Sequence, residues 1–306
     1  MKVAVVGSGS MGSLFGGFLA ESGVDVTLID RKPVVDAIKR HGLQITGISG
    51  DHYIRAKIAL KPSEVGVVEL VLIIVKAYDT EQAVIDAGPL IGKNTWVICL
   101  QNGLGNGEIA ARIIGKEKVI RGITTNGAIL EKPGKIIHTG TGETIIGRCY
   151  GSNTPEVDSI ARMISESGLP TSIAQNISGV VWEKALVNAG INPFGALTGL
   201  KNGELLEVPE IVVSMRELVL EGMKVAEKLG VNLLSDPVEK TFEVARGTAQ
   251  NKNSMLQDIE RGKRTEIDFI NGAISGYGKK HGVLTPVNDL ITALVKGLEK
   301  RTTKNS

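Results

Sequence analysis

Residues 180–193, VVWEKALVNAGINP, carry one lysine and two asparagines among small and apolar residues. Lys184, Asn188 and Asn192 recur every four residues, so on an α-helix they would lie along one side. A lysine can donate a proton and stabilise negative charge developing on an oxygen, and amides can bind a polar substrate without adding charge. A solvated helix face would explain the same spacing, and for a single lysine that is the commoner situation. Asparagine, however, is a poor helix former, and solvent-facing positions usually carry Glu, Lys or Arg.

A glycine-rich loop lies at the start of the chain. VAVVGSGSMGS contains Gly7-x-Gly9-x-x-Gly12, directly after a predicted strand and directly before a predicted helix. Gly7 would permit the tight turn, Gly9 would let the backbone approach a pyrophosphate, and Gly12 would let the helix pack close to the strand. The free N–H groups at the helix N-terminus would then bind the phosphates. The sequence therefore predicts a dinucleotide site at residues 7–12, that is Gly7, Ser8, Gly9, Ser10, Met11 and Gly12.

The type of dinucleotide depends on the end of the second predicted strand, LIDRKP, about twenty residues further on. Asp30 at this tip would bind a ribose 2′-hydroxyl and favour NAD, whereas Arg31 would pair with a 2′-phosphate and favour NADP. The two side chains could also form only a surface ion pair with each other. The residues themselves leave these alternatives open.

Asn102 and Gly103 follow the predicted strand TWVICL in the run LQNGLGNGE. The carboxyl ends of strands in an α/β sheet border the ligand crevice, so Asn102 is a candidate ligand residue. An ordinary Asn-Gly turn explains the pair equally well.

Two helix starts are predicted in the run NKNSMLQDIERGKRTEIDFING. Ser254 with Gln257 fits a capping box, and Thr265 with Asp268 resembles a second start after Gly262. We interpret Thr265 as a cap, whereas Ser254 could serve as a cap or as a ligand.

The first half of the chain alternates short β-branched runs with helical patterns. The runs are KVAVVG, DVTLI, LVLIIVK, TWVICL and KVIRGIT, and a helix is predicted near residues 11–22. This pattern predicts a parallel sheet covered on both faces in a doubly wound, Rossmann-type α/β domain. GKIIHTGTGETIIGRCY predicts a hairpin-like pair of strands. TPEVDSIARMISESG predicts a helix with Thr154 as its cap and Pro155 at its first position.

After about residue 175 the strand signal disappears and the remaining apolar patterns have helical period. We therefore expect a Rossmann domain over residues 1–175 and an all-helical domain over residues 176–306. The second domain would bind the substrate. Its apolar runs, such as IVV and LITALV, are compatible with a homodimer interface or with a core.

Composition excludes several classes of protein. The 306 residues include 35 basic and 33 acidic ones, a net charge of +2, so no basic footprint predicts binding to nucleic acid or a membrane surface. No apolar run approaches the roughly 20 residues that span a bilayer. The N-terminus resembles a signal peptide, but its glycines are better explained by the loop above. Cys99 and Cys149 share no metal-ligand spacing, so we expect a soluble, cytoplasmic protein with reduced thiols and no metal.

Together these motifs resemble those of the ketopantoate reductase (2-dehydropantoate 2-reductase) family. The matching runs, in order, are GSGSMG, VKAYDT, QNGLGN, WEKALVNAGINP, NGEL and NSMLQDIERGKRTEIDFING. The last run is long and specific, and the resemblance covers nearly the whole chain.

The resemblance implies a role for individual residues. Lys184, in the W-x-K helix, would be the catalytic acid. Asn188, Asn192, Asn202 and Ser254 would bind the substrate, and Asn102 would lie beside both nicotinamide and substrate. The cofactor would also meet Arg31, Lys76, Ala128 and Glu266, the last of these near a ribose.

The implied reaction is the reduction of ketopantoate to (R)-pantoate on the way to pantothenate and coenzyme A. Hydride transfer to the keto carbon leaves charge on oxygen, and a protonated Lys184 could neutralise it, whereas arginine would hold its proton too tightly. We expect the site in a cleft between the domains. The acid before Arg31 departs from the usual pattern of NADPH-dependent members, so NADP(H) is favoured and NAD(H) remains an alternative. Another two-domain 2-keto or 3-hydroxy acid dehydrogenase, or a non-catalytic NAD(P)H sensor, would share many of these features.

Overall fold

The computed structural model describes residues 1–303, which form two compact units. The first unit comprises Met1–Gln101 and Asn106–Ile177, and the second comprises Asn102–Gly105 together with residues 178–303. A four-residue loop in the middle of the first half of the sequence therefore belongs, by its contacts, to the helical unit.

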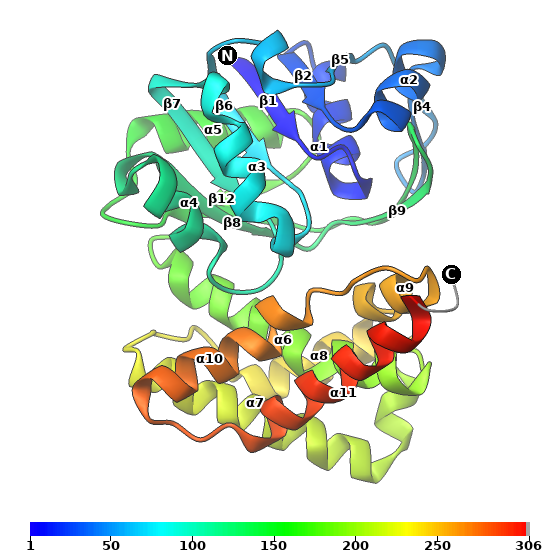
Figure 1. Ribbon diagram of the computed structural model, residues 1–306, viewed down its shortest axis with the longest axis vertical. Coiled ribbons are helices and arrows are strands. Elements are labelled where there is room, and N and C mark those ends of the chain that lie inside the picture. The colour runs from blue at the N-terminus through cyan, green and yellow to red at the C-terminus, as the bar shows by residue number, and fades with distance from the viewer. Residues whose placement is uncertain (304–306) are drawn as a thin grey trace. The chain divides into compact units, whose positions relative to one another are not determined.

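The first unit is built on an eight-stranded sheet with the order β12-β11-β8-β7-β6-β1-β2-β5 (Figure 1). Its strands are β1 (Lys2–Val6), β2 (Asp25–Ile29), β5 (Lys57–Ala59), β6 (Val68–Ile73), β7 (Ile91–Cys99), β8 (Val119–Thr124), β11 (Thr144–Arg148) and β12 (Thr171–Ile173). The six strands β5, β2, β1, β6, β7 and β8, neighbours in that order in the sheet, are mutually parallel, and β11 is antiparallel to β8. Their order, third-second-first-fourth-fifth-sixth along the chain, is that of a Rossmann fold. The predicted fold class is confirmed.

A second sheet has the order β4-β3-β10-β9, with β3 (Leu43–Gly47), β4 (His52–Ile54), β9 (Gly127–Lys132) and β10 (Lys135–Gly140). The predicted hairpin was wrong here: β10 and β11 both exist, but β10 pairs with β9 and β3, whereas β11 pairs with β8 and β12. The turn between β9 and β10 is Pro133-Gly134, with Gly134 at φ 76°. This dipeptide is a strong turn signal, and it identifies the true hairpin one strand earlier.

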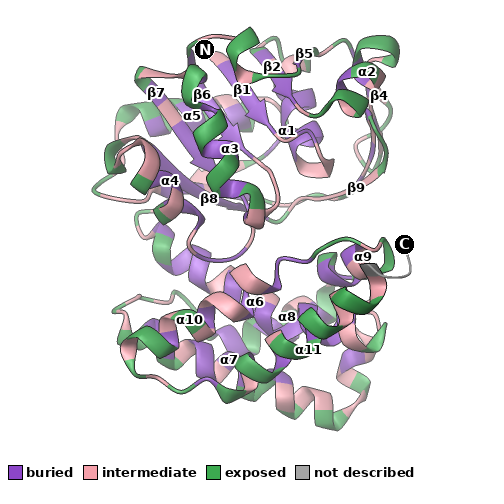
Figure 2. Ribbon diagram, viewed as in Figure 1, coloured by how far each residue is buried: buried purple, intermediate pink, exposed green. Residues whose placement is uncertain are grey.

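Both faces of the main sheet are buried, as the continuous apolar runs predicted (Figure 2). Along β1, Val3 and Val5 pack into one apolar cluster, and Ala4 and Val6 pack into another. Successive strand residues point to opposite faces, so the two clusters lie on the two sides of the sheet. The covering helices are α1 (Ser10–Glu21), α2 (Lys32–His41), α3 (Thr80–Asp86), α4 (Asn106–Ile114) and α5 (Pro155–Glu166).

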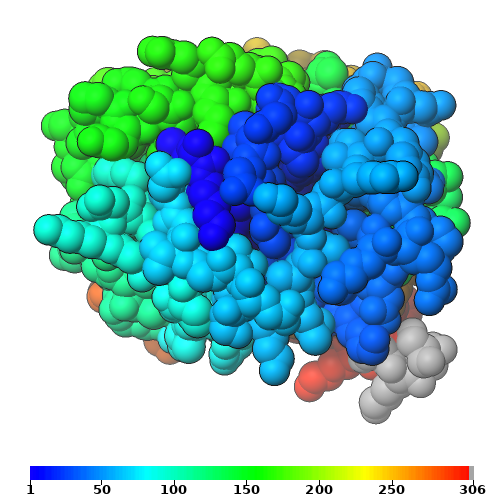
Figure 3. Space-filling model, turned by 90° about the horizontal axis from the view of Figure 1, so that it is seen from above, coloured from blue at the N-terminus to red at the C-terminus, as the bar shows by residue number. Residues whose placement is uncertain are grey.

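Figure 3 shows the face of the first unit at which β1 begins, with the N-terminal residues in dark blue. A surface pocket there is lined by Met1 and Lys2, by the turn before β2 and by Glu69 and Met163. It lies at the amino ends of the parallel strands. The glycine loop follows Val6, at their carboxyl ends.

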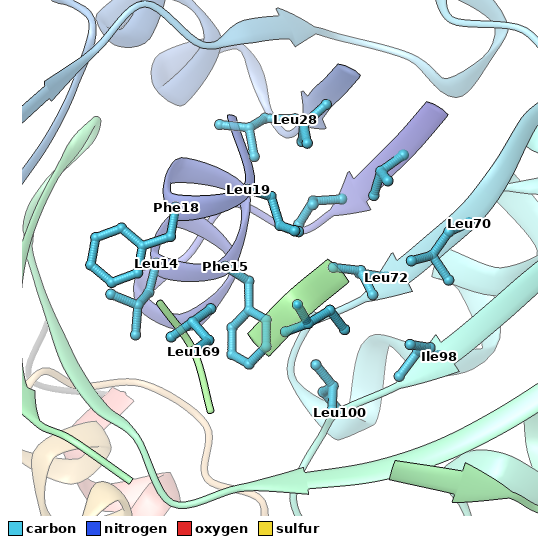
Figure 4. Packing of buried hydrophobic residues seen from close by; sticks show 14 of the residues in the cluster. Leu14, Phe15, Phe18, Leu19, Leu28, Leu70, Leu72, Ile98, Leu100 and Leu169 are labelled. Carbon is cyan, nitrogen blue, oxygen red and sulfur yellow. The ribbon is translucent and has the colours of Figure 1, made fainter. Parts of the chain in front are cut away.

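Helix α1 supplies much of the core on its face of the sheet. Phe15 and Leu19 point from it toward residues of the central strands, Leu14 lies near Leu169, and the Phe18 ring points the other way, edge-to-face with His52 and His138 of the second sheet (Figure 4). This packing fixes α1 against β1 and so sets the geometry of the loop that joins them. At the start of α5, Pro155 is the first residue as predicted, but the Thr154 side chain does not cap the helix.

The second unit is all-helical, as expected. Its α-helices are α6 (Ile177–Thr198), α7 (Pro209–Lys228), α8 (Pro237–Gly247), α9 (Ser254–Glu260), α10 (Asn271–His281) and α11 (Pro286–Thr303). Short 3-10 turns occur at η5 (Glu204–Glu207) and η6 (Ile267–Phe269). No helix within residues 1–303 is long and apolar enough to cross a membrane.

Candidate functional site

The glycine loop after β1 has the three properties that its sequence predicted. Gly7 adopts φ 94°, and a Cβ there would lie 2.8 Å from Cγ1 of Val75, in the loop after β6. A Cβ at Gly12 would overlap the carbonyl oxygen of Gly7. At Gly9 an added Cβ would meet no atom within 4 Å, so this side of the loop is open. The loops after β1 and β6 thus lie together at the point where the strand order reverses, which is where such sheets bind ligands.

The N-terminus of α1 has no side-chain cap. Gly9 occupies the N-cap position, and no acidic residue lies in the first turn, where Ser10 and Met11 begin the helix. The first N–H groups of a helix have no partner within it, and they carry partial positive charge. A cradle of this kind, open at Gly9, fits the pyrophosphate of a dinucleotide.

Asp30 is bound to the backbone of the glycine loop. Its Oδ2 accepts the N–H of Ser8 at 2.5 Å, and its Oδ1 accepts the N–H of Arg31 at 2.6 Å. No ion pair joins the Asp30 and Arg31 side chains in the part of the chain that the structure describes, so the surface-pair interpretation was wrong. Arg31 is exposed at the N-cap of α2. The Asp30 carboxylate therefore binds backbone N–H groups, whereas the Arg31 guanidinium is exposed.

The other cofactor residues that the resemblance implied lie on different elements of the first unit. Lys76 follows β6 and occupies the N-cap of the turn η2 (Ala77–Asp79), next to the Val75 that packs on Gly7. Ala128 lies in β9, opposite His138 of β10, and packs against the apolar cluster around α1. Lys76 is therefore at the carboxyl edge of the main sheet, and Ala128 belongs to the smaller sheet.

Helix α6 is buried along most of its length. Within residues 180–196, only Glu183, Lys184 and Asn188 are not buried. The Glu183 carboxylate accepts the backbone N–H groups of Leu234 and Ser235. The accessible part of the helix is thus reduced to a small area that includes Lys184 and Asn188.

The side-chain amides of the two asparagines of the stripe make no hydrogen bond to any described residue of the chain. Asn188 is half-buried, and Asn192 is only 5% exposed. The amide atoms of both residues are not among the fully buried polar atoms without a partner, so they keep some accessible surface that a polar ligand could reach.

Asn102 contacts Glu266 within the helical unit. Its Nδ2 donates to Oε2 of Glu266 at 3.3 Å, and Glu266 is buried. The adjoining Leu104 N–H donates to the Phe269 carbonyl at 2.7 Å, and a Cβ at Gly103 would overlap that same carbonyl. Gly103 is therefore required for the close approach, and the Asn-Gly pair serves both as a turn and as an anchor.

Ser254 is not the cap of its helix. The N-cap of α9 is Asn253, whose side chain accepts the N–H of Leu256 at 3.0 Å. Gln257 donates to the Lys252 carbonyl, so the expected capping box does not form. Ser254 is exposed and its hydroxyl has no hydrogen-bond partner within residues 1–303. The cap prediction was thus one residue too late, and the Ser254 hydroxyl remains available.

Asn202 has partners inside the protein. Its Nδ2 donates to Thr248 Oγ1 at 2.8 Å, and its Oδ1 accepts from Asn253 Nδ2 at 3.4 Å. Asn253 also packs against α6, because a Cβ at Gly195 would overlap its amide nitrogen. Asn253 was not singled out from the sequence, although its position one residue before Ser254 is an ordinary N-cap signal.

Helix α6 contacts the segment that contains Ser254 and the segment that contains Glu266. At Gly195 it contacts Asn253, which precedes Ser254 and bonds Asn202. At Ala189 its carbonyl accepts from Asn271, shortly after Glu266. Asn271, fully buried, was also missed, because a buried amide in an apolar helix has no distinctive sequence signal.

Thr265 serves partly as predicted. Its Oγ1 accepts the N–H of Ile267 at 3.2 Å, but Asp268 binds Arg264 and Lys296 rather than completing a capping box. Among residues 1–303 no group of His, Cys, Asp and Glu could hold a metal ion.

Comparison with known proteins assigns the family. The model of the family described as ketopantoate reductase PanE/ApbA matches residues 3–151, and the model of its C-terminal domain matches residues 176–299. The chain belongs to the ketopantoate reductase family. It is 40% identical over 300 residues to the 2-dehydropantoate 2-reductase of Pyrococcus horikoshii, covering 98% of both chains.

Solved ketopantoate reductase structures have the same fold. A PanE/ApbA family ketopantoate reductase from Ralstonia eutropha JMP134 is 32% identical with a TM-score of 0.93, covering 99% of both chains. A D-mandelate dehydrogenase, solved with NADH and anilino(oxo)acetate, is 34% identical with a TM-score of 0.92 over the same coverage. The fold is therefore shared with a dehydrogenase named for a different hydroxy acid.

Proposed function

We propose that this protein reduces ketopantoate to (R)-pantoate with a nicotinamide cofactor, and that Lys184 is the proton donor. The observation that carries the proposal is the short accessible stretch of the buried helix α6. There a lysine stands one turn from Asn188, and the amides of Asn188 and Asn192 lack partners. Membership of the ketopantoate reductase family supports the substrate.

Reduced nicotinamide supplies the hydride when it is bound. The chain's own contribution is to bind the keto acid and neutralise the oxygen. A lysine ammonium next to the keto oxygen stabilises the developing charge and then transfers its proton to that oxygen. Arginine could stabilise the charge but would retain its proton.

The substrate's carboxylate and hydroxyl would be bound by neutral groups. Asn188, Asn192 and Ser254 have hydrogen-bonding capacity that no described residue uses. Asn102, beside Glu266, would face both substrate and nicotinamide. Asn202 would contribute less strongly, because Thr248 and Asn253 already engage its amide.

We propose that the cofactor occupies the cradle at residues 7–12, with Lys76, Ala128 and Glu266 as further contacts. NADP(H) is favoured because the Arg31 guanidinium is exposed at the N-terminus of α2, where it could pair with a 2′-phosphate. Asp30 accepts two backbone N–H groups, which partly offsets its negative charge. NADH is the alternative that a direct comparison would reveal.

A homodimer in the cytoplasm completes the proposal. In the run LITALV, Ile291 and Val295 are buried, whereas Leu290 and Leu294 are 61% and 49% exposed. The run therefore contributes to the core and also presents an apolar strip on α11. Light scattering on the purified protein measures the mass directly, and a monomer at all concentrations would refute this part.

A second candidate is a 2-keto acid reductase with another substrate, favoured by the close likeness to D-mandelate dehydrogenase. The test is to follow NADPH and NADH oxidation with ketopantoate and with benzoylformate, the keto acid that corresponds to mandelate. We expect the higher kcat/KM with ketopantoate. A preference for benzoylformate would exclude the first proposal in favour of the second.

The same assay with Lys184→Ala and Lys184→Arg tests the acid. Loss of a general acid typically lowers kcat by about 10²–10⁴-fold, and arginine should not restore it. Binding of NADPH, followed by its fluorescence, should persist in both variants because Lys184 lies outside the cradle. Unchanged turnover in Lys184→Ala would eliminate Lys184 as the donor, and a wild type that binds cofactor but reduces no keto acid would indicate a sensor.

A further inference from the structure

We propose that Glu299, near the end of α11, is a positioning residue for Glu266 and Asn102. The proposal rests on the proposed function, because it deepens the role of these two site residues. Glu299 would act through Thr265, without touching substrate or cofactor itself.

The first link joins α11 to the loop before η6. One carboxylate oxygen of Glu299 accepts both the backbone N–H of Thr265 at 2.7 Å and its hydroxyl at 2.6 Å. Thr265 is only 1% exposed. Hydrogen bonds to an ionised acceptor are roughly twice as strong as neutral ones, so this pair holds the Thr265 backbone firmly.

The second link runs from Thr265 to Glu266. These residues are adjacent, so fixing the Thr265 amide and side chain restricts the peptide that leads into Glu266. The Thr265 hydroxyl also accepts the N–H of Ile267 at 3.2 Å, which starts the turn η6 directly after Glu266. Glu266 is thereby held from both sides, and its buried carboxylate is directed at Nδ2 of Asn102.

The third link carries the effect to the Asn102 loop. Leu104 N–H donates to the carbonyl of Phe269, the last residue of η6, and Gly103 packs on that carbonyl. The position of the loop Asn102–Gly105 therefore depends on the position of residues 266–269. A shift of that turn would move Asn102 as well as Glu266, and misplacement of a binding group by an ångström can cost about 10²-fold in rate.

A neighbouring pair on the same helix provides a matched control. Lys296, one turn before Glu299 on α11, bonds the Asp268 carboxylate at 2.8 Å, and Asp268 also bonds Arg264. The Lys296 side chain is half exposed, and such ion pairs contribute little. Lys296→Ala thus removes a contact between the same helix and the same loop without touching Thr265.

The experiment compares Glu299→Ala, Glu299→Gln and Lys296→Ala in the full-length protein. Measured quantities are Tm, kcat and KM for the keto acid and the cofactor, and the hydrogen-exchange rate of the Leu104 amide. We expect Glu299→Ala to lower kcat/KM at least tenfold at a temperature well below its Tm, and to speed Leu104 exchange by about the same factor, as for loss of a partly buried charged hydrogen bond. Glu299→Gln retains an acceptor oxygen and should recover most of both values. Lys296→Ala should resemble the wild type.

Two results would overturn the proposal. One is a Glu299→Ala protein that loses thermal stability while its kinetics and its Leu104 exchange stay at the wild-type values. The other is a Glu299→Gln protein as impaired as Glu299→Ala, since the amide oxygen can accept both Thr265 bonds. The exchange measurement needs no substrate, so it tests the positioning role of Glu299 even if the wild type does not reduce ketopantoate. Such a lack of activity would count against the proposed function alone.

Discussion

The carboxylate of Asp30 accepts a hydrogen bond from the backbone N–H of Ser8, with 2.5 Å between the heavy atoms. The acid at the end of β2 is thus tied to the glycine loop that follows β1. A second oxygen of the same carboxylate accepts the N–H of Arg31. Asp30 braces the loop, whatever further contact it makes with a ribose.

This relationship predicts how the two residues divide cofactor binding. Asp30→Ala should weaken NADPH and NADH binding alike, by about tenfold or more, because a loop held by a charged hydrogen bond is released. Arg31→Ala should weaken NADPH binding by about tenfold and leave NADH nearly unchanged, because only NADPH has a 2′-phosphate. Fluorescence titration with each cofactor measures both. If Asp30→Ala impaired NADH alone, Asp30 would instead act mainly as a ribose ligand.

Two glycines of the cradle should respond differently to alanine. Gly12→Ala places a methyl group onto the Gly7 carbonyl, so α1 must shift, and overpacking of this kind typically costs about 1–3 kcal/mol. Gly9→Ala meets no protein atom, so its Tm should fall less than that of Gly12→Ala, by no more than the loss of a good N-cap residue, while cofactor affinity falls. Thermal unfolding and cofactor titration separate the two effects. Wild-type affinity in Gly9→Ala would place the pyrophosphate elsewhere.

Asn253 combines a helix cap with a bridge to Asn202, and substitution can separate the two functions. Asn253→Ala should destabilise the protein by about 1 kcal/mol through loss of the cap, whereas serine still caps well. Both variants lose the amide that donates to Asn202, so both should raise KM for the keto acid. An unchanged KM in Asn253→Ser would show that the bridge does not order the substrate site.

The ion pairs of Asp268 predict a pH-dependent contribution to stability. Burial alone would raise the pKa of Asp268, but hydrogen bonds from Lys296 and Arg264 outweigh it and hold the pKa below the ordinary 3.8. A depressed carboxylate pKa stabilises the fold above the unfolded value and loses that effect as pH falls through the folded value. Asp268→Asn should therefore be less stable at pH 7, by up to about 1 kcal/mol for partly exposed pairs, and the difference should shrink as pH falls below 3.8 and vanish only below the lower folded-state pKa. Urea unfolding of both proteins from pH 7 down to below the folded-state pKa measures this difference in stability. A difference that persists at the lowest pH would contradict the assignment.

The two thiols should be inert in the folded protein. Burial raises the pKa of Cys99 to about 12 and that of Cys149 to about 12, so neither is a thiolate at neutral pH. Ellman's reagent should react with neither at an appreciable rate until guanidinium unfolds the chain, and should then detect both. Rapid reaction of Cys149 in the native state would show that its sulfur is accessible.

Local patterns were sufficient for much of the fold and of the site. The apolar runs predicted the parallel strands, and the glycine spacing predicted the cradle, because both depend on residues close together in the chain. The same is true of α6, whose four-residue polar spacing predicted one common side. The prediction of a hairpin at residues 135–148 was wrong because strand pairing depends on partners distant in sequence. Strand β10 pairs with β3, some ninety positions earlier.

By itself, the sequence determined the class of fold, the family and the residue types that the reaction needs, since these follow from periodicity and motif. It could not determine which residues of α6 stay accessible, because that depends on the helices that bury the rest of α6. Nor could it reveal that Asp30 binds Ser8, or that Glu299 and Thr265 meet across 34 positions. Such contacts join segments that only packing brings together, and the tertiary structure alone decided them.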